Sequence, residues 1–427
     1  MSKKFEPPKG TRDFLPEDMR VRRMVFDRLR HHFRLHGFDE LDTPAFEYLE
    51  VLTLKAGAQA ENEIYSFTDK GDRKLGLRFD LTSSTGRVAA SHAELPRPIY
   101  RFQIDKVWRY DRPQAGRYRE FYQADTDIIG SYSIECEVEL LQMATEILRS
   151  FDLHEYKLVV NNRKILEAQI RIAGIPPEKK PDALRALDKL LKVGKDGMKA
   201  EFLQYGLSEK QFDDFYKTIV VDTLDDAETR VSSDEGGRAG VAELRELFSR
   251  AERLGFAQHL QFDWSLVRGL DYYTGPIFEA HAKVEGGFGS FGGGGRYDDL
   301  VALYGGQPQG AVGFSFGVER LIGLLLQREA KIPTSRPALL VAAPEQAQFD
   351  AAVNLSTKLR EGGVAVRLLP TGWNRGQIFK YSTATGMHKV ILVGAEEAAS
   401  GIYGLRDGET RTEEKLAPPE IIARLRS

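Results

Sequence analysis

The sequence predicts an α+β protein in two parts, with a helical segment inserted in the first part and a small α/β domain in the second. Three observations indicate this fold class. A strand, a basic loop and a second strand follow one another between residues 107 and 129. Apolar residues then recur at helical spacing over 161–258. Beyond that, the apolar runs Leu339–Ala343 and Lys389–Val393 are fit for buried strands and alternate with helical stretches, which favours a largely parallel sheet.

The segment 107–129 places polar side chains in strands whose other residues are apolar or aromatic. Arg109 ends the first strand, and the second strand carries Gln123 and Asp127. Four arginines lie within eleven residues around the turn, a density that a solvated hairpin tip also shows. Polar residues inside a strand need partners, and a ligand is one candidate. Without further context, Asp127 is best interpreted as an ordinary residue at a strand end.

The stretch Arg268–Gly275, RGLDYYTG, combines a fixed cation, an acid and two phenols between glycines. Arginine keeps its charge at any working pH and grips carboxylate or phosphate through two parallel hydrogen bonds. Tyr272 and Tyr273 offer apolar walls whose hydroxyl tips need partners when buried. A hairpin with a surface ion pair explains these eight residues about equally well, so the stretch alone leaves pocket and hairpin open.

Two further segments are rich in small residues. Gly292–Gly295 is a run of four glycines, which weakens any strand that includes it. Taken alone, this run is more typical of a flexible loop than of a phosphate cradle, and no P-loop pattern follows it. The segment Gly310–Ile322 runs from a small-residue strand into an amphipathic helix with Arg320 in its first turns. By default such a helix belongs to a core, and such an arginine is a surface charge.

Bulk properties exclude several classes of protein. A net charge of −3 does not suit a polycation that holds nucleic acid by its overall field, so any grip on RNA needs local basic faces. The one cysteine, Cys136, excludes an internal disulfide framework and a cysteine-rich zinc site. We find no apolar signal segment in MSKKFEPPKG and no apolar run long enough to span a bilayer. From these properties and a length of 427 residues we expect a soluble, cytoplasmic protein of two or three domains.

Together these segments resemble the class II aminoacyl-tRNA synthetases, and most closely the histidyl-tRNA synthetase family. The hairpin of Arg109 is similar to class motif 2, and residues 313–321, with Arg320, are similar to motif 3. RGLDYYTG and GGGGRYDD resemble the two signature peptides of this family. Leu77–Thr82 is similar to its amino-acid-binding strand, in the D-L-T form rather than the E-G-T form. Motif 1 is expected in the helix Arg20–Gly37 and the strand that follows it.

The resemblance covers nearly the whole chain and implies a fold. The family has a class II catalytic domain built on a mixed, mainly antiparallel sheet, a helical insertion, and a C-terminal α/β anticodon-binding domain. We therefore expect a first catalytic part at 1–160, the insertion at 161–258, a second catalytic part at 259–330, a linker at 331–337 and the anticodon-binding domain at 338–427.

The resemblance also implies roles for individual residues. Arg109 bridges the α-phosphate of ATP and the substrate carboxylate, and Arg268 adds a second charge at that phosphate. The residues implied to bind histidine are Asp80, Thr82, Arg109, Gln123, Asp127, Arg268, Tyr272 and Tyr273. Among these, Asp80, Thr82 and Gln123 hold the α-amino group, while Asp127 and Tyr273 hold the two imidazole nitrogens. The residues implied to bind ATP are Arg109, Asp111, Arg117, Phe121 and Arg320. Gln114 is implied to contact the first acceptor pair of the tRNA.

The implied activity is that of a ligase, which activates L-histidine with ATP to histidyl-adenylate and transfers it to the 3′ end of histidine tRNA. The attacking carboxylate is already ionised, so positioning and cationic clamps carry most of the rate. Mg²⁺ is expected to enter with ATP, and no protein residue is assigned as a metal ligand. The expected partners are histidine tRNA, L-histidine, ATP and a second copy of the chain in a homodimer, with no membrane.

Two alternatives stay open. The first is a catalytically silent, synthetase-like regulatory subunit of histidine biosynthesis. The second is a class II enzyme for another amino acid. Such regulatory paralogues usually lack the C-terminal domain and the motif arginines. Here Arg109, Arg268 and Arg320 are all present, as is a tail from Pro337. Another amino acid would require other residues at Asp127 and Tyr273.

Overall fold

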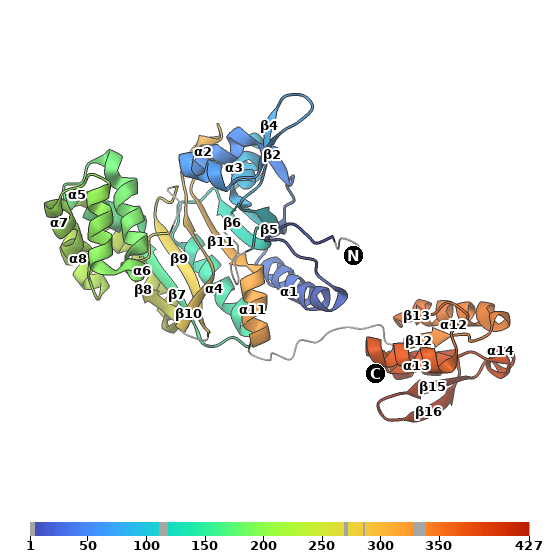
Figure 1. Ribbon diagram of the computed structural model, residues 1–427. Coiled ribbons are helices and arrows are strands. Elements are labelled where there is room, and N and C mark those ends of the chain that lie inside the picture. The colour runs from blue at the N-terminus through green and yellow to red at the C-terminus, as the bar shows by residue number, and fades with distance from the viewer. Residues whose placement is uncertain (1–4, 111–117, 269–271, 285–286, 328–338, 427) are drawn as a thin grey trace. The chain divides into compact units, whose positions relative to one another are not determined.

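The computed structural model describes residues 5–110, 118–268, 272–284, 287–327 and 339–426. The chain divides into two compact units, residues 1–332 and 333–427, and each is described by itself (Figure 1). Among the helices described, none combines the length and the apolar character needed to cross a membrane.

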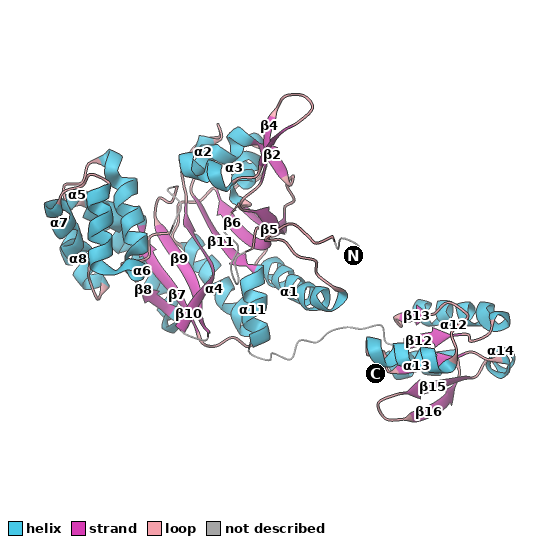
Figure 2. Cartoon of the chain, viewed as in Figure 1, coloured by secondary structure: helices cyan, strands magenta, loops and turns pink. Residues whose placement is uncertain are grey.

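An eight-stranded mixed sheet forms the centre of the first unit (Figure 2). Its strands lie in the order β1-β5-β6-β11-β10-β9-β7-β8. The two outermost pairs are parallel and the five pairs between them are antiparallel, which confirms the mixed, mainly antiparallel sheet. The strands are β1 (Asp39–Glu40), β5 (Ile99–Trp108), β6 (Glu120–Ile129), β7 (Tyr156–Asn162), β8 (Leu260–Phe262), β9 (Pro276–Val284), β10 (Gly287–Arg296) and β11 (Ala311–Gly317).

The two faces of this sheet differ in chemistry because side chains alternate along each strand. On one face Phe102, Phe278 and Phe314 are buried in a single core with several helices. These include α1 (Pro16–Leu35), α4 (Glu135–Ser150) and α11 (Val318–Gln327). The opposite side is here called the polar face; one row across its four middle strands consists of Asp125, Ser315, Gly293 and Glu279.

The four glycines of Gly292–Gly295 lie inside β10, paired with β9 on one side and β11 on the other. The interpretation as a flexible loop is therefore wrong. A Cβ atom at Gly293 would lie 2.6 Å from the carbonyl oxygen of Phe278, so the strand requires glycine to let neighbouring groups approach. The run of glycines marks a place of close packing rather than one of free movement.

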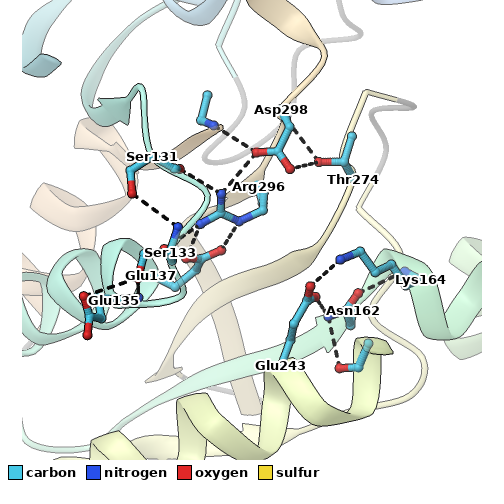
Figure 3. A network of polar contacts seen from close by, with 12 residues as sticks. Ser131, Ser133, Glu135, Glu137, Asn162, Lys164, Glu243, Thr274, Arg296 and Asp298 are labelled. Carbon is cyan, nitrogen blue, oxygen red and sulfur yellow. Dashed lines mark hydrogen bonds and ion pairs between the residues drawn. The ribbon is translucent and has the colours of Figure 1, made fainter. Parts of the chain in front are cut away.

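A buried polar network ties the end of β10 to α4 (Figure 3). Arg296 donates from Nε and Nη2 to the two carboxylate oxygens of Glu137, each across 2.6 Å. Its other contacts are the carbonyl oxygens of Ser131 and Ser133 and the carboxylate of Asp298. Burial raises the pKa of Glu137 although Arg296 opposes that shift. The bidentate pair fixes the strand that carries the glycines.

Helices fill the segment between β7 and β8. They are α5 (Arg163–Ile172), α6 (Lys180–Gln204), α7 (Glu209–Ile219), α8 (Leu224–Val231) and α9 (Glu235–Arg253). Apolar residues of α5, α6 and α7 pack into a second core, which includes Leu184 and Leu187. Those of α8 and α9, such as Val231 and Leu244, belong to the first core. Polar sides of these helices carry ion pairs, such as Lys180 with Glu167 across 2.8 Å.

Smaller elements complete the first unit. A three-stranded sheet has the order β2-β4-β3, and its strands are β2 (Phe46–Tyr48), β3 (Ser66–Thr68) and β4 (Lys74–Leu77). Three short helices accompany it, α2 (Leu49–Ala60), α3 (Thr82–Ser91) and α10 (Leu300–Leu303). The helix expected for motif 1 is α1, and the strand that follows it, β1, pairs with β5 in parallel.

The second unit contains a five-stranded sheet in the order β13-β12-β14-β15-β16. Its strands are β12 (Leu339–Ala342), β13 (Val366–Leu368), β14 (Lys389–Leu392), β15 (Tyr403–Asp407) and β16 (Thr412–Leu416), and its helices are α12 (Phe349–Glu361), α13 (Arg375–Thr385), α14 (Ala395–Ser400) and α15 (Pro418–Arg426). Only the first three strands in this order are parallel, so the largely parallel sheet expected is half right. The antiparallel hairpin was missed because β16, with the sequence TEEKL, is mostly exposed and lacks an apolar run.

Candidate active site

Two cavities adjoin on the polar face, and five residues line both of them. The outer cavity has a volume of about 210 Å³ and the inner cavity about 60 Å³. The shared residues are Arg109, Gln123, Arg268, Gly293 and Ser315. A pair of small molecules held in these cavities would therefore meet at two arginines.

Arg109 follows β5 and is held by the backbone of a neighbouring segment. Its Nε donates to the carbonyl oxygen of Phe79 across 2.9 Å. The guanidinium lies 5.2 Å from the centre of the Phe121 ring, within the range of a cation–π contact. These contacts fix the cation at the boundary between the two cavities.

Arg268 reaches the same boundary from a strained position. Its φ of 60° is in the left-handed region, which is uncommon for residues other than glycine. Nη1 donates to Oε1 of Glu279 on β9 across 3.2 Å. Strain of this kind persists where the surrounding structure determines it and often occurs at ligand sites.

The charges of Arg268 and Glu279 stabilise each other. Burial alone would raise the pKa of Glu279, but hydrogen bonding with His281 and the charge of Arg268 hold it at about 2. Ser290 also donates to this carboxylate, across 2.7 Å. Burial would lower the pKa of Arg268, whereas Tyr273 and Glu279 keep it above its ordinary value. Arg268 is thus a permanent cation in the site.

The outer cavity has a third cation at its edge. Arg320 lies in the first turn of α11, and its Nη1 donates to the carbonyl oxygen of Ser290 across 3.0 Å. Its side chain is exposed, as expected for a surface charge, yet it lines the cavity together with Phe121. Aromatic and cationic walls of this kind suit a nucleotide.

The inner cavity is lined by the carboxylate of Asp127, which is buried inside β6. Its Oδ2 forms an ion pair with Arg101, and its Oδ1 accepts a hydrogen bond from the hydroxyl of Tyr297. Both partners are also buried. Asp127 is therefore not a solvated residue at a strand end, and two side chains hold its orientation.

Two tyrosines and the start of α3 form further walls of the inner cavity. The rings of Tyr272 and Tyr273 are 4.5 Å apart, and the Tyr272 hydroxyl donates to that of Tyr273 across 3.4 Å. Burial and then the charge of Tyr273 raise the pKa of Tyr272 well above its ordinary value, so Tyr272 remains a hydrogen-bond donor. Asp80 Oδ1 accepts from the backbone N–H of Ser83 across 3.0 Å, which anchors its carboxylate just before Thr82 begins the helix.

The structure brings the predicted site residues together wherever it describes them. The ten that line one cavity or both are Asp80, Thr82, Arg109, Phe121, Gln123, Asp127, Arg268, Tyr272, Tyr273 and Arg320. Asp111, Gln114 and Arg117 lie outside the described residues. Sequence reasoning missed Arg101, Asp125 and Tyr297, although the signal applied to Asp127, a polar residue in an apolar strand, is also present at Arg101 and Asp125.

A mainly antiparallel sheet with fixed arginines between an outer cationic cavity and an inner acidic one defines a class II aminoacyl-tRNA synthetase. The family model described as histidyl-tRNA synthetase matches residues 10–321. The chain belongs to the histidyl-tRNA synthetase family.

Curated relatives and solved structures agree with this family. The histidine–tRNA ligase of Pyrococcus horikoshii is 32% identical and covers 99% of both chains. That of Rhodopirellula baltica is 35% identical over 96% of this chain and 94% of its own. The histidyl-tRNA synthetase of Nostoc sp. PCC 7120 matches with a TM-score of 0.81 at 25% identity, over 100% of this chain and 99% of the other. An ATP phosphoribosyltransferase regulatory subunit/histidyl-tRNA synthetase from Bacillus halodurans shares the fold, with a TM-score of 0.75 at 24% identity, over 90% of this chain and 97% of the other.

Proposed function

We propose that this chain activates L-histidine with ATP to form histidyl-adenylate, and then transfers the histidyl group to the 3′ end of histidine tRNA. The observation that carries this proposal is that Arg109 and Arg268 line both cavities. A carboxylate oxygen of histidine attacks the α-phosphorus of ATP, and the bond to pyrophosphate breaks. Both reacting groups are anionic, so two fixed cations where they meet lower the barrier by neutralising charge and by positioning.

ATP occupies the outer cavity in this proposal. Phe121 stacks on adenine and Arg320 holds the outer phosphates. Asp111 accepts a hydrogen bond from the adenine amino group, and Arg117 adds a cation. Mg²⁺ enters as the counter-ion of ATP and leaves with pyrophosphate. Among the residues that the structure describes, no group of three His, Cys, Asp or Glu side chains forms a metal site.

Histidine occupies the inner cavity, with its carboxylate towards the two arginines. Asp80, Thr82 and Gln123 hold the α-ammonium group, and Tyr272 closes the wall beside Tyr273. Asp127 and Tyr273 contact the imidazole nitrogens, one of which donates and the other accepts in the neutral ring. Two paired hydrogen bonds reject rings of similar size because the wrong ligand leaves them unsatisfied. The fixed orientation of Asp127 supports this assignment.

The remaining assignments concern the tRNA, assembly and location. Gln114 contacts the first acceptor pair, and the unit from 333 to 427 binds the anticodon. We further place the enzyme in the cytoplasm as a homodimer, with α1 and β1 at the interface between copies. These assignments rest on the family to which the chain belongs.

The regulatory alternative is less well supported. A subunit that only senses histidine needs the inner cavity but has no use for cations at an adjoining nucleotide cavity. Here Arg109, Arg268 and Arg320 all line the outer cavity. This arrangement favours the enzyme.

ATP–pyrophosphate exchange with each standard amino acid in turn tests the proposal. We expect rapid exchange with histidine alone, and charging of histidine tRNA by the same preparation. Exchange with a different amino acid would show that the inner cavity has been misassigned. No exchange with any amino acid, from a protein that binds histidine, would favour the regulatory subunit.

A further inference from the structure

Asp125 is a buried carboxylate in the inner cavity that the proposed mechanism does not use. It lies on β6 between Gln123 and Asp127, and all three side chains point to the polar face. Only 3% of its surface is exposed. A buried carboxylate is costly unless a partner compensates it, so the position requires a physical explanation.

The hydrogen bonding of Asp125 differs from that of Asp127. Both oxygens of Asp127 are engaged, by Arg101 and by Tyr297. Within the described part of the chain, Oδ1 of Asp125 is buried and has no hydrogen-bond partner. The same is true of Oε1 of Gln123, two residues along the same face. The cavity thus presents two adjacent acceptors that lack a donor.

The charges around Asp125 show which kind of donor is missing. Burial, together with the charges of Asp127 and Asp80, raises the pKa of Asp125 to about 7, although the charge of Arg101 opposes the shift. A positively charged donor in the cavity would reverse these effects and keep the carboxylate ionised. Of the groups of histidine, the α-ammonium carries a positive charge and three donors, whereas neutral imidazole has one donor.

The register of the sheet locates the two ends of the substrate. Asp125, Ser315, Gly293 and Glu279 form one row, and Arg268 pairs with the last of them. This row therefore offers an anion, Asp125, to the α-ammonium group and a cation, Arg268, to the α-carboxylate group. Both groups are attached to the same carbon atom of histidine. The next row contains Asp127, Gly313 and Gly295. A Cβ atom added at Gly295 would lie 2.9 Å from the Tyr273 ring, so Tyr273 lies close to this row. The imidazole ring belongs to this second row.

We infer that Asp125 is a further histidine-binding residue, whose carboxylate accepts a hydrogen bond from the α-ammonium group of the substrate. Gln123 supplies the neighbouring acceptor. Ser315 is a positioning residue, because its Oγ accepts from Gln123 Nε2 across 2.8 Å and its hydroxyl also bonds to Asp125. This inference rests on the proposed function and names a contact within the same site.

Calorimetric titration of the full chain with two ligands tests the inference. L-histidine carries the ammonium group, while 3-(imidazol-4-yl)propanoate keeps the ring and carboxylate and lacks the amine. For Asp125→Asn we expect the affinity for L-histidine to fall on the order of tenfold to a hundredfold, and that for the propanoate to change by less than about threefold. Asp127→Asn provides the contrast, since loss of an imidazole contact weakens both ligands.

The outcomes are distinct. Asparagine has nearly the shape of aspartate and removes a buried charge, so the ligand-free Asp125→Asn protein should melt no lower than the wild type. Equal losses for both ligands would place Asp125 at the imidazole and overturn the inference, as would unchanged affinity for L-histidine. Failure of the wild-type protein to bind L-histidine at all would overturn the proposed function itself, and the inference with it.

Discussion

Gly293 and Arg268 are in close contact on the polar face, because a Cβ atom on Gly293 would lie 2.7 Å from Nη1 of the arginine. The glycine sits in the middle of the sheet, where its neighbour Phe278 presents a carbonyl oxygen 2.6 Å from the same Cβ position. Absence of a side chain at 293 therefore sets the height at which the guanidinium lies above the strand. Gly293 and Arg268, which belong to the two signature peptides, thus depend on each other for their positions.

Gly293→Ala should displace Arg268 and reduce activation of histidine. A misplacement of about 1 Å costs on the order of a hundredfold in rate, and overpacking costs about 1–3 kcal/mol of stability. ATP–pyrophosphate exchange and thermal melting measure the two effects. Gly323→Ala on α11 is the matched control, since nothing lies within 4 Å of its Cβ position, and it should leave activity unchanged. Normal exchange by Gly293→Ala would mean that the contact has no role in catalysis.

Asp127→Ala should lower kcat/KM for histidine by tens to hundreds of fold. The variant leaves the buried imidazole N–H without an acceptor, which costs about 1–3 kcal/mol or more. The KM for ATP should barely change. The melting temperature should also fall, since Arg101, with 3% of its side chain exposed, would lose its counter-ion.

Two conservative variants separate these effects. Asp127→Asn keeps one acceptor and should lie between the wild type and the alanine variant in kcat/KM. Tyr297→Phe removes only the hydroxyl that donates to Asp127, so its effect on histidine should be smaller than that of Asp127→Ala. If Asp127→Ala weakens ATP and histidine alike, or lowers only thermal stability, Asp127 is a structural residue.

A chain that ends at residue 332 should remain folded and still activate histidine. The boundary between the two compact units lies there, and the described lining of both cavities belongs to the first unit. Aminoacylation of tRNA should fall much further than activation, because the second unit is proposed to bind the anticodon. Parallel measurements of pyrophosphate exchange and tRNA charging test this, and an equal loss of both would contradict the proposed division of roles.

His36 should make stability depend on pH. It lies at the end of α1 with Nδ1 2.6 Å from Glu139 and Nε2 2.9 Å from Glu146, both on α4. Hydrogen bonding to Glu139 raises its pKa, burial opposes the shift, and Glu146 adds to it. Protonated His36 therefore stabilises the folded protein. This contribution is complete at a pH below about 6.5, the pKa of histidine in the unfolded chain, and is lost as the pH rises through the raised pKa of the folded state.

His36→Gln should therefore melt lower than the wild type at pH 6, on the order of 1–3 °C, with a smaller difference at pH 9. Melting of both proteins at the two pH values measures this. A difference that does not depend on pH would show that the ion pairs of His36 contribute nothing.

The sequence allowed much of the site to be predicted, because several of its signals are local. Arg109 and Gln123 stand out as polar residues in apolar strands, and RGLDYYTG and Leu77–Thr82 match family patterns. The interpretation of Asp127 as a residue at a strand end failed, because its burial depends on Arg101 and Tyr297, which join it only through the pairing of distant strands.

Other features required the three-dimensional structure. Gly292–Gly295 gives no strand signal, yet it pairs on both sides because β9 and β11 supply the contacts that its own side chains lack. Asp125 carries the same local signal as Asp127, but its unpartnered oxygen and its row on the sheet follow from the register. Local chemistry was therefore predictable, whereas partnerships across the sheet were not.

ATP–pyrophosphate exchange with histidine by Arg268→Ala tests most directly the central claim, that the fixed cations shared by the two cavities carry amino acid activation. Glu279 keeps His281 and Ser290 as partners in this variant, so the fold should persist with a melting temperature near that of the wild type. Loss of a preorganised charge at the transition state should reduce exchange by at least about a hundredfold to a thousandfold, with tRNA binding nearly intact. Exchange at the wild-type rate by a folded Arg268→Ala protein would contradict the account.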